Sequence, residues 1–348
     1  MLIQKSSDKH NKIYQFMISE RLSTLLNRYC RILFFIVLTT ASLNLFAQNE
    51  FEIELLVDND LFTFTEDEDR YYSSGIFASF RKPVDQESGF FKALNFNENT
   101  LNLIHGFRIK QLVYTADELD FVDIRVQDRP FAGILSLGYQ ISLFRKNDLI
   151  FNFNQDIGLL GPGSGTSTIH TWWHKQLNLD DPTSWEFQIE NRFLFNSRLE
   201  LIKSFPLVRN RMELMYESHY EFGTIFNNIR QEGTMRIGLL ESLSKSGYRN
   251  GMVGTVTGDL RPGKIREFYL FFGLGTEYVF SNYTIEGEFP EKEFAPVNRI
   301  ENWIFLTKSG FNIHWDKWDL GWHFFFHTRE NSRAQNHRYG RIRVTKRF

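Results

Sequence analysis

Three polar stretches of the sequence carry the side-chain types that acid–base, metal and ester chemistry require. They are Asn59, Asp60, Asp69 and Ser73 in the first stretch, Asp128 and Arg129 in the second, and His170, His174 and Asp180 in the third. Strand interiors disfavour Asp and Asn, whereas turns tolerate them. Each stretch is therefore either a plain turn or a site, and the rest of the chain must decide between the two.

The first stretch can hold a cation. Asp60 and Asn59 offer a carboxylate and an amide oxygen, which are ligands that a hard divalent ion takes. The alternative for this pair is an Asx-turn that closes a hairpin. Ser73 stands at the head of the next strand, where its hydroxyl can be a nucleophile or a donor that positions a substrate. Most serines at strand starts are neither.

The third stretch can supply a general base, because imidazole titrates near neutral pH. His174 takes this role if it lies within reach of the cation, and it is a solvated loop residue otherwise. His170 lies four residues earlier, and spacing alone does not separate the two candidates. In the second stretch, Arg129 can hold a phosphate or carboxylate through two parallel hydrogen bonds. It can equally form an internal pair within the Asp128–Pro130 run that stiffens the wall.

β-Strands must position these stretches, because apolar and polar residues alternate along most of the chain. In residues 151–157 the Phe and Ile side chains share one face and the Asn and Asp side chains share the other. Residues 341–348 alternate arginines with apolar residues in the same way. Large apolar residues on one face and polar residues on the other are typical of a transmembrane β-barrel. A water-soluble β-sandwich shows the same alternation. The membrane barrel is favoured by the signal peptide predicted at the amino terminus and by the aromatic residues at the ends of the strands.

The sequence predicts an all-β fold, a twelve-stranded antiparallel transmembrane β-barrel with long extracellular loops and short periplasmic turns. The candidate strands are residues 50–60, 73–82, 101–115, 130–145, 148–160, 185–203, 207–225, 230–243, 265–282, 298–315, 318–328 and 337–348. Bacterial barrels begin and end in the periplasm, so the first strand runs outward. All three polar stretches then fall on the extracellular rim.

The amino terminus predicts a secretory signal peptide over residues 1–47, followed by one barrel domain over residues 48–348. Basic residues precede an apolar run that ends near Ala47. The single cysteine, Cys30, lies in this leader, so the mature chain can build no disulfide or zinc–thiolate framework. The formal net charge of −2 argues against a nucleic-acid partner. The mean hydropathy of −0.34 is compatible with a barrel whose alternate residues face lipid.

Several short motifs follow one another in an order that resembles a known family. They are Asn59-Asp60, the run from Asp69 to Gly75, Asp128-Arg129-Pro130-Phe131-Ala132-Gly133, Asp156-Ile157-Gly158 leading to Gly161-Pro162, and Gln188-Ile189-Glu190-Asn191-Arg192. Together they resemble the outer-membrane lipid A 3′-O-deacylases, which are twelve-stranded barrels. The resemblance spans roughly residues 51–348 and is strongest from 51 to 192.

The resemblance implies hydrolysis of the ester that holds the 3′-acyloxyacyl group on lipid A, by a histidine-activated water with the help of a divalent cation, expected to be calcium. By position, the family's functional residues fall on His174 as the base with His170 as fallback, Asp180 as its acidic partner, Asn59 and Asp60 as the amide–carboxylate pair that holds the cation, and Ser73 as the hydroxyl. Glu is usual at the position of Asp180, and Thr is common at that of Ser73. The polar residues that the family has just before the histidine are replaced here by Thr168–Trp173.

The resemblance also implies partners for the protein, and two alternative functions remain open. The substrate would be lipid A or lipopolysaccharide at the outer membrane, with no nucleic acid, and a monomer is the default expectation. Trp172, Trp173 and Trp185 are expected to contact acyl chains at the membrane interface. One alternative is a non-enzymatic barrel, either a porin or a lipopolysaccharide binder. Another is a serine-type barrel phospholipase with Ser73 or Ser164 as nucleophile.

Overall fold

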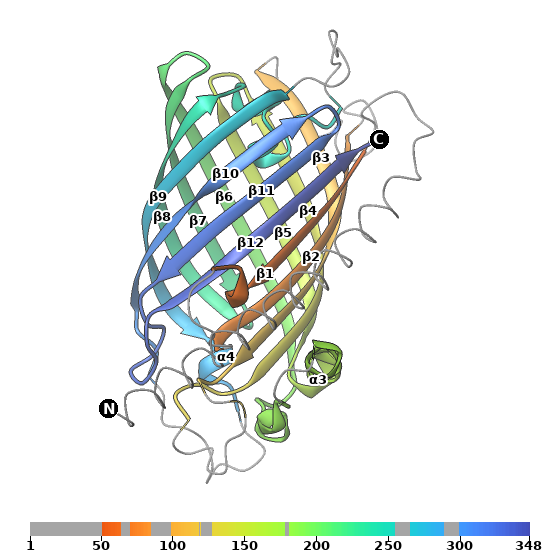
Figure 1. Ribbon diagram of the computed structural model, residues 1–348, viewed down its shortest axis with the longest axis vertical. Coiled ribbons are helices and arrows are strands. Elements are labelled where there is room, and N and C mark those ends of the chain that lie inside the picture. The colour runs from red at the N-terminus through yellow and green to blue at the C-terminus, as the bar shows by residue number, and fades with distance from the viewer. Residues whose placement is uncertain are drawn as a thin grey trace, which may run out of the picture. The chain divides into compact units, whose positions relative to one another are not determined.

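The computed structural model describes residues 51–63, 70–84, 99–117, 119, 127–177, 181–254, 265–288 and 299–348. Within these residues, twelve strands form a closed antiparallel barrel in which each strand pairs with its sequence neighbours and β1 closes the ring against β12 (Figure 1). The strands are β1 Glu52–Asn59, β2 Tyr71–Pro83, β3 Thr100–Thr115, β4 Ala132–Arg145, β5 Leu149–Leu160, β6 Arg192–Val208, β7 Met212–Gly223, β8 Phe226–Leu239, β9 Ile265–Asn282, β10 Trp303–Trp315, β11 Trp318–His327 and β12 His337–Arg347. The predicted fold class is confirmed. The predicted leader lies outside the described residues, as do Asp69 and Asp180.

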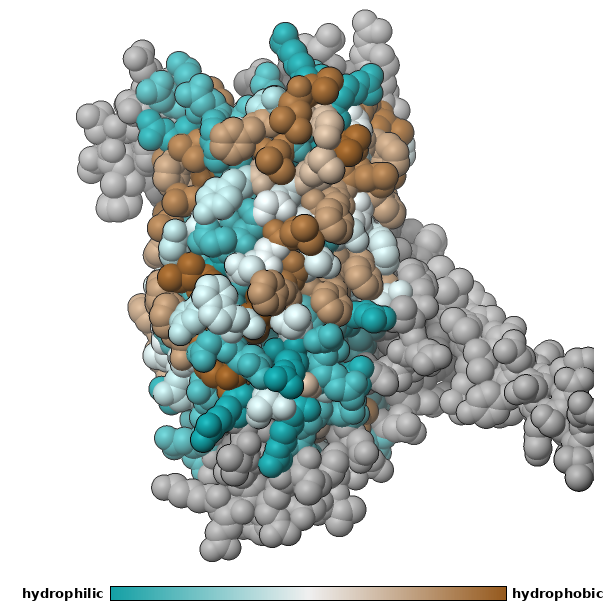
Figure 2. Space-filling model, turned by 90° about the vertical axis from the view of Figure 1, so that its left-hand side faces the viewer, coloured by the Kyte–Doolittle hydropathy of each residue, from teal (hydrophilic) through white to brown (hydrophobic). Residues whose placement is uncertain are grey.

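The outer face of the barrel is apolar because every second residue of a strand points outward. In β9, Phe268, Leu270, Phe272 and Leu274 are all exposed, while the residues between them point inward. Figure 2 shows hydrophobic residues across the middle of the barrel wall and hydrophilic residues gathered near its lower end. Among the residues that the structure describes, no helix combines the length and the hydropathy needed to cross a membrane.

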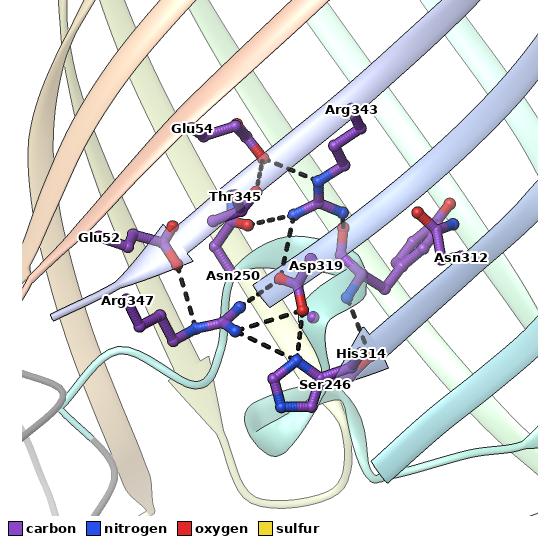
Figure 3. A network of polar contacts seen from close by, with 12 residues as sticks. Glu52, Glu54, Ser246, Asn250, Asn312, His314, Asp319, Arg343, Thr345 and Arg347 are labelled. Atoms are coloured by element: carbon purple, nitrogen blue, oxygen red, sulfur yellow. Dashed lines mark hydrogen bonds and ion pairs between the residues drawn. The ribbon is translucent and has the colours of Figure 1, made fainter. Parts of the chain in front are cut away.

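The barrel interior contains many ion pairs between inward-facing side chains. Arg343 of β12 donates from Nε to Glu54 Oε2 at 2.9 Å, and the adjacent Arg347 pairs with Asp319 of β11 (Figure 3). Arg81 of β2 bridges the two glutamates of β1, with N–O distances of 2.9 Å to Glu52 and 2.7 Å to Glu54. Paired and hydrogen-bonded charges of this kind can be buried without a prohibitive desolvation cost.

Residues 240–254, which we call the lumenal plug, lie inside this interior. The segment contains the short helices η5 (Leu243–Lys245) and η6 (Gly247–Arg249). Its side chains and backbone contact inward-facing groups from strands all around the ring: Asn102 of β3, Glu200 of β6, Glu217 of β7, Arg236 of β8, Glu267 of β9, Lys308 of β10 and Arg343 of β12. A segment that touches seven strands on different sides of a barrel must occupy its lumen.

The lumenal plug belongs to a long connection, which corrects the prediction that the periplasmic turns are all short. The turns at residues 146–148, 209–211 and 316–317 are short, as expected. The connections between β2 and β3 (residues 84–99) and between β8 and β9 (residues 240–264) are long. The second of these folds back into the barrel because its polar groups and its apolar residues Leu243 and Val253 both find partners there.

The opposite end of the barrel carries the other described helices. They are η1 (Asp60–Thr63), η3 (Pro162–Ser164), α3 (Thr166–Leu177), η4 (Thr183–Phe187) and α4 (Tyr283–Glu286), and α3 and α4 lie together at the lower end of Figure 1. The sequence reading placed a loop over residues 161–184 and a strand over 185–203. Instead, α3 occupies the loop, and the strand begins only at Arg192.

Candidate active site

One row of residues crosses the outer face of the barrel at the α3 end. Asn59 of β1 pairs with Ser74 of β2, Ser74 with Val113 of β3, and Val113 with Gly133 of β4. Asp58, immediately before the first of these, points into the lumen, where it binds Arg341. By alternation, therefore, the row faces outward. We call these four residues and Ser73 the outer-face patch.

A β-bulge brings Ser73 to the outer-face patch. The pairing of β2 with β3 passes from Tyr72–Tyr114 directly to Ser74–Val113, so Ser73 is an extra residue without a partner in the ladder. Bulges re-aim side chains and are frequent beside active sites. Ser73 is almost wholly buried, with 1% exposure, and its carbonyl accepts a hydrogen bond of 3.3 Å from the Asn59 side-chain amide.

Asp60 follows directly as the first residue of η1. Its carboxylate Oδ2 accepts the backbone N–H of Arg70 at 3.2 Å, which ties the two sides of the β1–β2 connection together. Its backbone carbonyl accepts the hydroxyl of Thr63 at 2.9 Å. Asp60 is nearly buried and follows Asn59, whose side-chain amide lies beside the Ser73 bulge.

Helix α3 presents its two histidines on its buried face. It begins after Gly165, which adopts a left-handed conformation with φ of 68° that glycine accommodates readily. Thr166 at its start packs closely over Gly133, where a side chain would clash with it. Thr166, His170 and His174 follow at four-residue spacing and are all buried, because such residues share one helix face. The helix is thereby anchored on the fourth strand of the outer-face patch.

The two histidines contact each other and a tryptophan from η4. Nε2 of His170 lies 3.1 Å from Nε2 of His174. The indole Nε1 of Trp185 lies 3.1 Å from Nδ1 of His170. Trp185 packs in one apolar cluster with Val113 and Phe131, so the imidazole pair is linked through it to the outer-face patch. His174 is 3% exposed, which corrects the alternative of a solvated loop histidine.

The second polar stretch, Asp128 and Arg129, binds residues at the barrel opening, which we call the mouth. Tyr71 donates its hydroxyl to Asp128 at 2.7 Å. Arg129 is fully buried, forms an ion pair with Glu330 of the β11–β12 loop, and donates to Thr284 Oγ1 of α4 at 2.6 Å. Its guanidinium also lies 4.3 Å from the ring centre of Tyr114. Of the two roles considered for Arg129, the contacts are those of an internal pair, but the partner is Glu330 and not a residue of the Asp128–Pro130 run.

The electrostatics of this loop follow from the same contact. Burial by itself raises the pKa of the Glu330 carboxyl, but the Arg129 guanidinium opposes this and holds the pKa below its usual value.

Ser164, the other serine considered as a nucleophile, donates its hydroxyl to the Gly161 carbonyl at 2.7 Å and accepts the backbone N–H of Thr166. Those bonds are typical of a hydroxyl that stabilises the start of α3.

The structure joins Asn59 to Ser73 by a hydrogen bond, and Asp60 follows Asn59 in the chain. His170 and His174 contact each other and Trp185, which shares an apolar cluster with Val113, the β3 partner of Ser74. It sets Arg129 apart in the mouth. The described residues include no group of three or more His, Cys, Asp or Glu side chains arranged to share a metal ion. The prediction that Trp185 contacts acyl chains is wrong, because its ring is buried against His170. Its only sequence signal was a tryptophan in the polar segment that follows the helix.

Comparisons with known proteins give a matching family model and similar solved structures. The model of the family "Outer membrane protein LpxR" matches residues 32–348. The structure of LpxR from Salmonella typhimurium is similar, with a TM-score of 0.68 and 18% identity over 85% of this chain and 100% of that chain. The beta domain of the Bordetella autotransporter Brka gives a TM-score of 0.42 at 8% identity, over 86% of this chain and 99% of that chain. The KdgM porin gives a TM-score of 0.35 at 9% identity, over 85% and 99%.

A search of curated proteins finds no match. The family model nevertheless spans nearly the whole sequence, including every motif described above. The chain therefore belongs to the outer membrane protein LpxR family, the outer-membrane lipid A deacylases that its motifs resemble.

Proposed function

We propose that the protein is a lipid A deacylase that hydrolyses the ester-linked 3′-acyloxyacyl group of lipopolysaccharide lipid A at the outer leaflet. Family membership supports the lipid A substrate. The observation that carries the proposal is that α3, which holds the buried imidazole pair, packs through Thr166 on Gly133 of the outer-face patch at one rim of the barrel. The ester bonds of a membrane lipid lie near the boundary between headgroups and acyl chains, the level of this rim. A lipid can reach such a site sideways, without entering the lumen.

In this mechanism His174 accepts a proton from the attacking water while that water forms a bond to the ester carbonyl carbon. The tetrahedral intermediate then expels the sugar oxygen, to which His174 returns the proton, giving a free fatty acid and a hydroxyl. The hydroxyl of Ser73 and the amide of Asn59 are proposed to be the donors that orient the ester. Asp180 is proposed to orient His174, as its family position implies.

The proposed cation is calcium, held by Asp60 and Asn59. The donor chemistry fits, because both side chains offer oxygen atoms and calcium takes carboxylate and amide oxygens together with water. When bound, the ion would polarise the ester carbonyl and stabilise negative charge on its oxygen. The hydrogen bond from Arg70 restrains the Asp60 side chain, and the hydrogen bond to Ser73 restrains that of Asn59.

The outer side of α3 supports contact with acyl chains. Ile169 and Trp172 are 45% and 53% exposed and lie three residues apart, on the helix face turned away from the wall. The ring of Trp173 lies 5.5 Å from that of Trp172. Exposed indoles favour the membrane–water interface. Trp185 does not share this role, since its buried ring binds His170.

Mass spectrometry of lipid A tests the function. Cells that express the chain should lose one ester-linked acyloxyacyl group relative to cells with an empty vector. In membranes from these cells, a chelator should suppress the reaction, and added calcium should restore it. Asp60→Asn should require more calcium than the wild type. Unchanged lipid A would contradict the function itself. Hydrolysis that resists chelation but stops with a serine-directed inhibitor would favour the serine-type mechanism with Ser73.

The lumenal plug gives a test that distinguishes the proposed enzyme from a porin. Because residues 240–254 bind seven strands across the interior, the purified protein in a planar lipid bilayer should give no steady ionic conductance. Replacing residues 243–253 by a short Gly/Ser linker should produce discrete conductance steps. A wild-type channel with open steps would contradict the closed lumen and favour the porin.

A further inference from the structure

The contact between Trp185 and His170 determines where one ring proton lies. An indole N–H can only donate a hydrogen bond, so His170 Nδ1, 3.1 Å from Trp185 Nε1, must accept. An accepting imidazole nitrogen carries no proton. A neutral His170 therefore carries its proton on Nε2. All three rings are nearly buried, with 6% exposure for Trp185, 5% for His170 and 3% for His174.

The second contact extends this assignment to His174. The two Nε2 atoms are 3.1 Å apart, and one of them must donate to the other. If His174 donated, His170 would accept at both nitrogens and would carry no ring proton, which a neutral imidazole does not allow. His170 Nε2–H is therefore the donor and His174 Nε2 the acceptor. It follows that a neutral His174 carries its proton on Nδ1.

We infer that Trp185 and His170 are positioning residues, which hold the proton of His174 on Nδ1 and keep Nε2 as its proton-accepting atom. The tautomer assignment stands on the two contacts alone. Its catalytic meaning rests on the proposed function, in which His174 is the base. When water attacks, its O–H replaces the His170 N–H as the hydrogen-bond partner of His174 Nε2.

This arrangement also opposes premature protonation of His174. A protonated His174 would carry N–H groups at both nitrogens and would turn one of them toward the His170 N–H, 3.1 Å away. The His170 hydrogen bond thus favours the neutral, base-competent form. The described charged side chains on the surrounding segments include Lys175 of α3 itself, Asp181 and Glu186 before and within η4, and Asp117 after β3, and all four are exposed. His170 is the titratable group whose contact with His174 is geometrically defined.

Nitrogen NMR of the mature barrel in detergent micelles tests the tautomers without any substrate. The protein carries ¹⁵N-labelled histidine, and difference spectra against His170→Gln and His174→Gln assign the two rings. We expect a protonated Nδ1 on His174 and a protonated Nε2 on His170. Trp185→Phe, which removes the indole donor, should give mixed tautomers for both rings. Trp303→Phe, an exposed tryptophan of β10, is the matched control and should change neither.

The pH dependence of kcat/KM tests the catalytic meaning. His170→Leu removes the donor, and the acid limb of the profile should move to higher pH by about half to one unit, the size expected for one hydrogen bond. His170→Gln keeps a side-chain N–H donor at the same place and should shift the limb less. A profile unchanged in His170→Leu and Trp185→Phe, or wild-type tautomers opposite to those given, would overturn the inference. If no variant and no wild type deacylates lipid A while the tautomers are as expected, the proposed function fails and the assignment stands.

Discussion

His174→Ala should reduce deacylation of lipid A by roughly a hundredfold or more, the lower end of what general acid–base catalysis contributes. The alanine removes the atom that takes the proton from water, and the other imidazole cannot replace it. His170 accepts the Trp185 indole at Nδ1 and bears its proton on Nε2, so it has no lone pair to offer. The measurement is the rate of acyl release from purified lipopolysaccharide, followed by mass spectrometry.

The control for this experiment is a change on the same helix that leaves the histidines in place. Lys175→Gln alters an exposed side chain next to His174 and should retain the wild-type rate. His170→Gln should retain a large part of the rate, because the amide still donates to His174. Full activity in His174→Ala together with loss in His170→Gln would reverse the two assignments. Full activity in both would remove imidazole catalysis from the mechanism.

The strands and the rim were predictable from local patterns, but the helix was not. Alternation along residues 151–157 and 341–348 identified strands, and counting strands placed all three polar stretches at one end. Helix α3 contains Thr, Ser, His and Trp, which are weak helix formers. Its sequence also has no apolar stripe from which its buried face could be predicted. The helix is stabilised by the Ser164 hydroxyl, which accepts the Thr166 N–H, and by contacts with Gly133 and Trp185. Those contacts join residues from different parts of the sequence.

The lumenal plug was unpredictable for a related reason. Residues 240–254 pair with groups such as Asn102 and Lys308 that lie far away in the sequence, and no local period marks such a segment. Ser73 is a milder case. Its strand was predicted to begin at this residue, but only the pairing with β3 shows that it forms a bulge without a partner in the ladder. The candidate residues could be named from motifs, but not which of them share a surface.

Arg129→Met should lower the free energy of unfolding of the barrel by roughly 3–5 kcal/mol, the usual cost of removing one partner from a buried ion pair. The guanidinium has no exposed surface, binds Glu330 and Thr284, and stacks against Tyr114. Methionine keeps much of the apolar volume but leaves the Glu330 carboxylate, 18% exposed, without its cation. Urea unfolding in lipid vesicles, followed by tryptophan fluorescence, measures the change.

Two comparisons separate this role from that of a substrate ligand. The double variant Arg129→Met with Glu330→Gln should recover most of the lost stability, because no unpaired charge remains. The effect of the single variant should also shrink in acid. The folded-state pKa of Glu330 is lowered, so its carboxylate stabilises the fold above the unfolded pKa and loses that contribution as the pH falls through the folded value. If Arg129→Met instead unfolds like the wild type while KM for lipopolysaccharide rises, Arg129 binds the substrate, and the contacts with Glu330 and Thr284 describe only the substrate-free mouth.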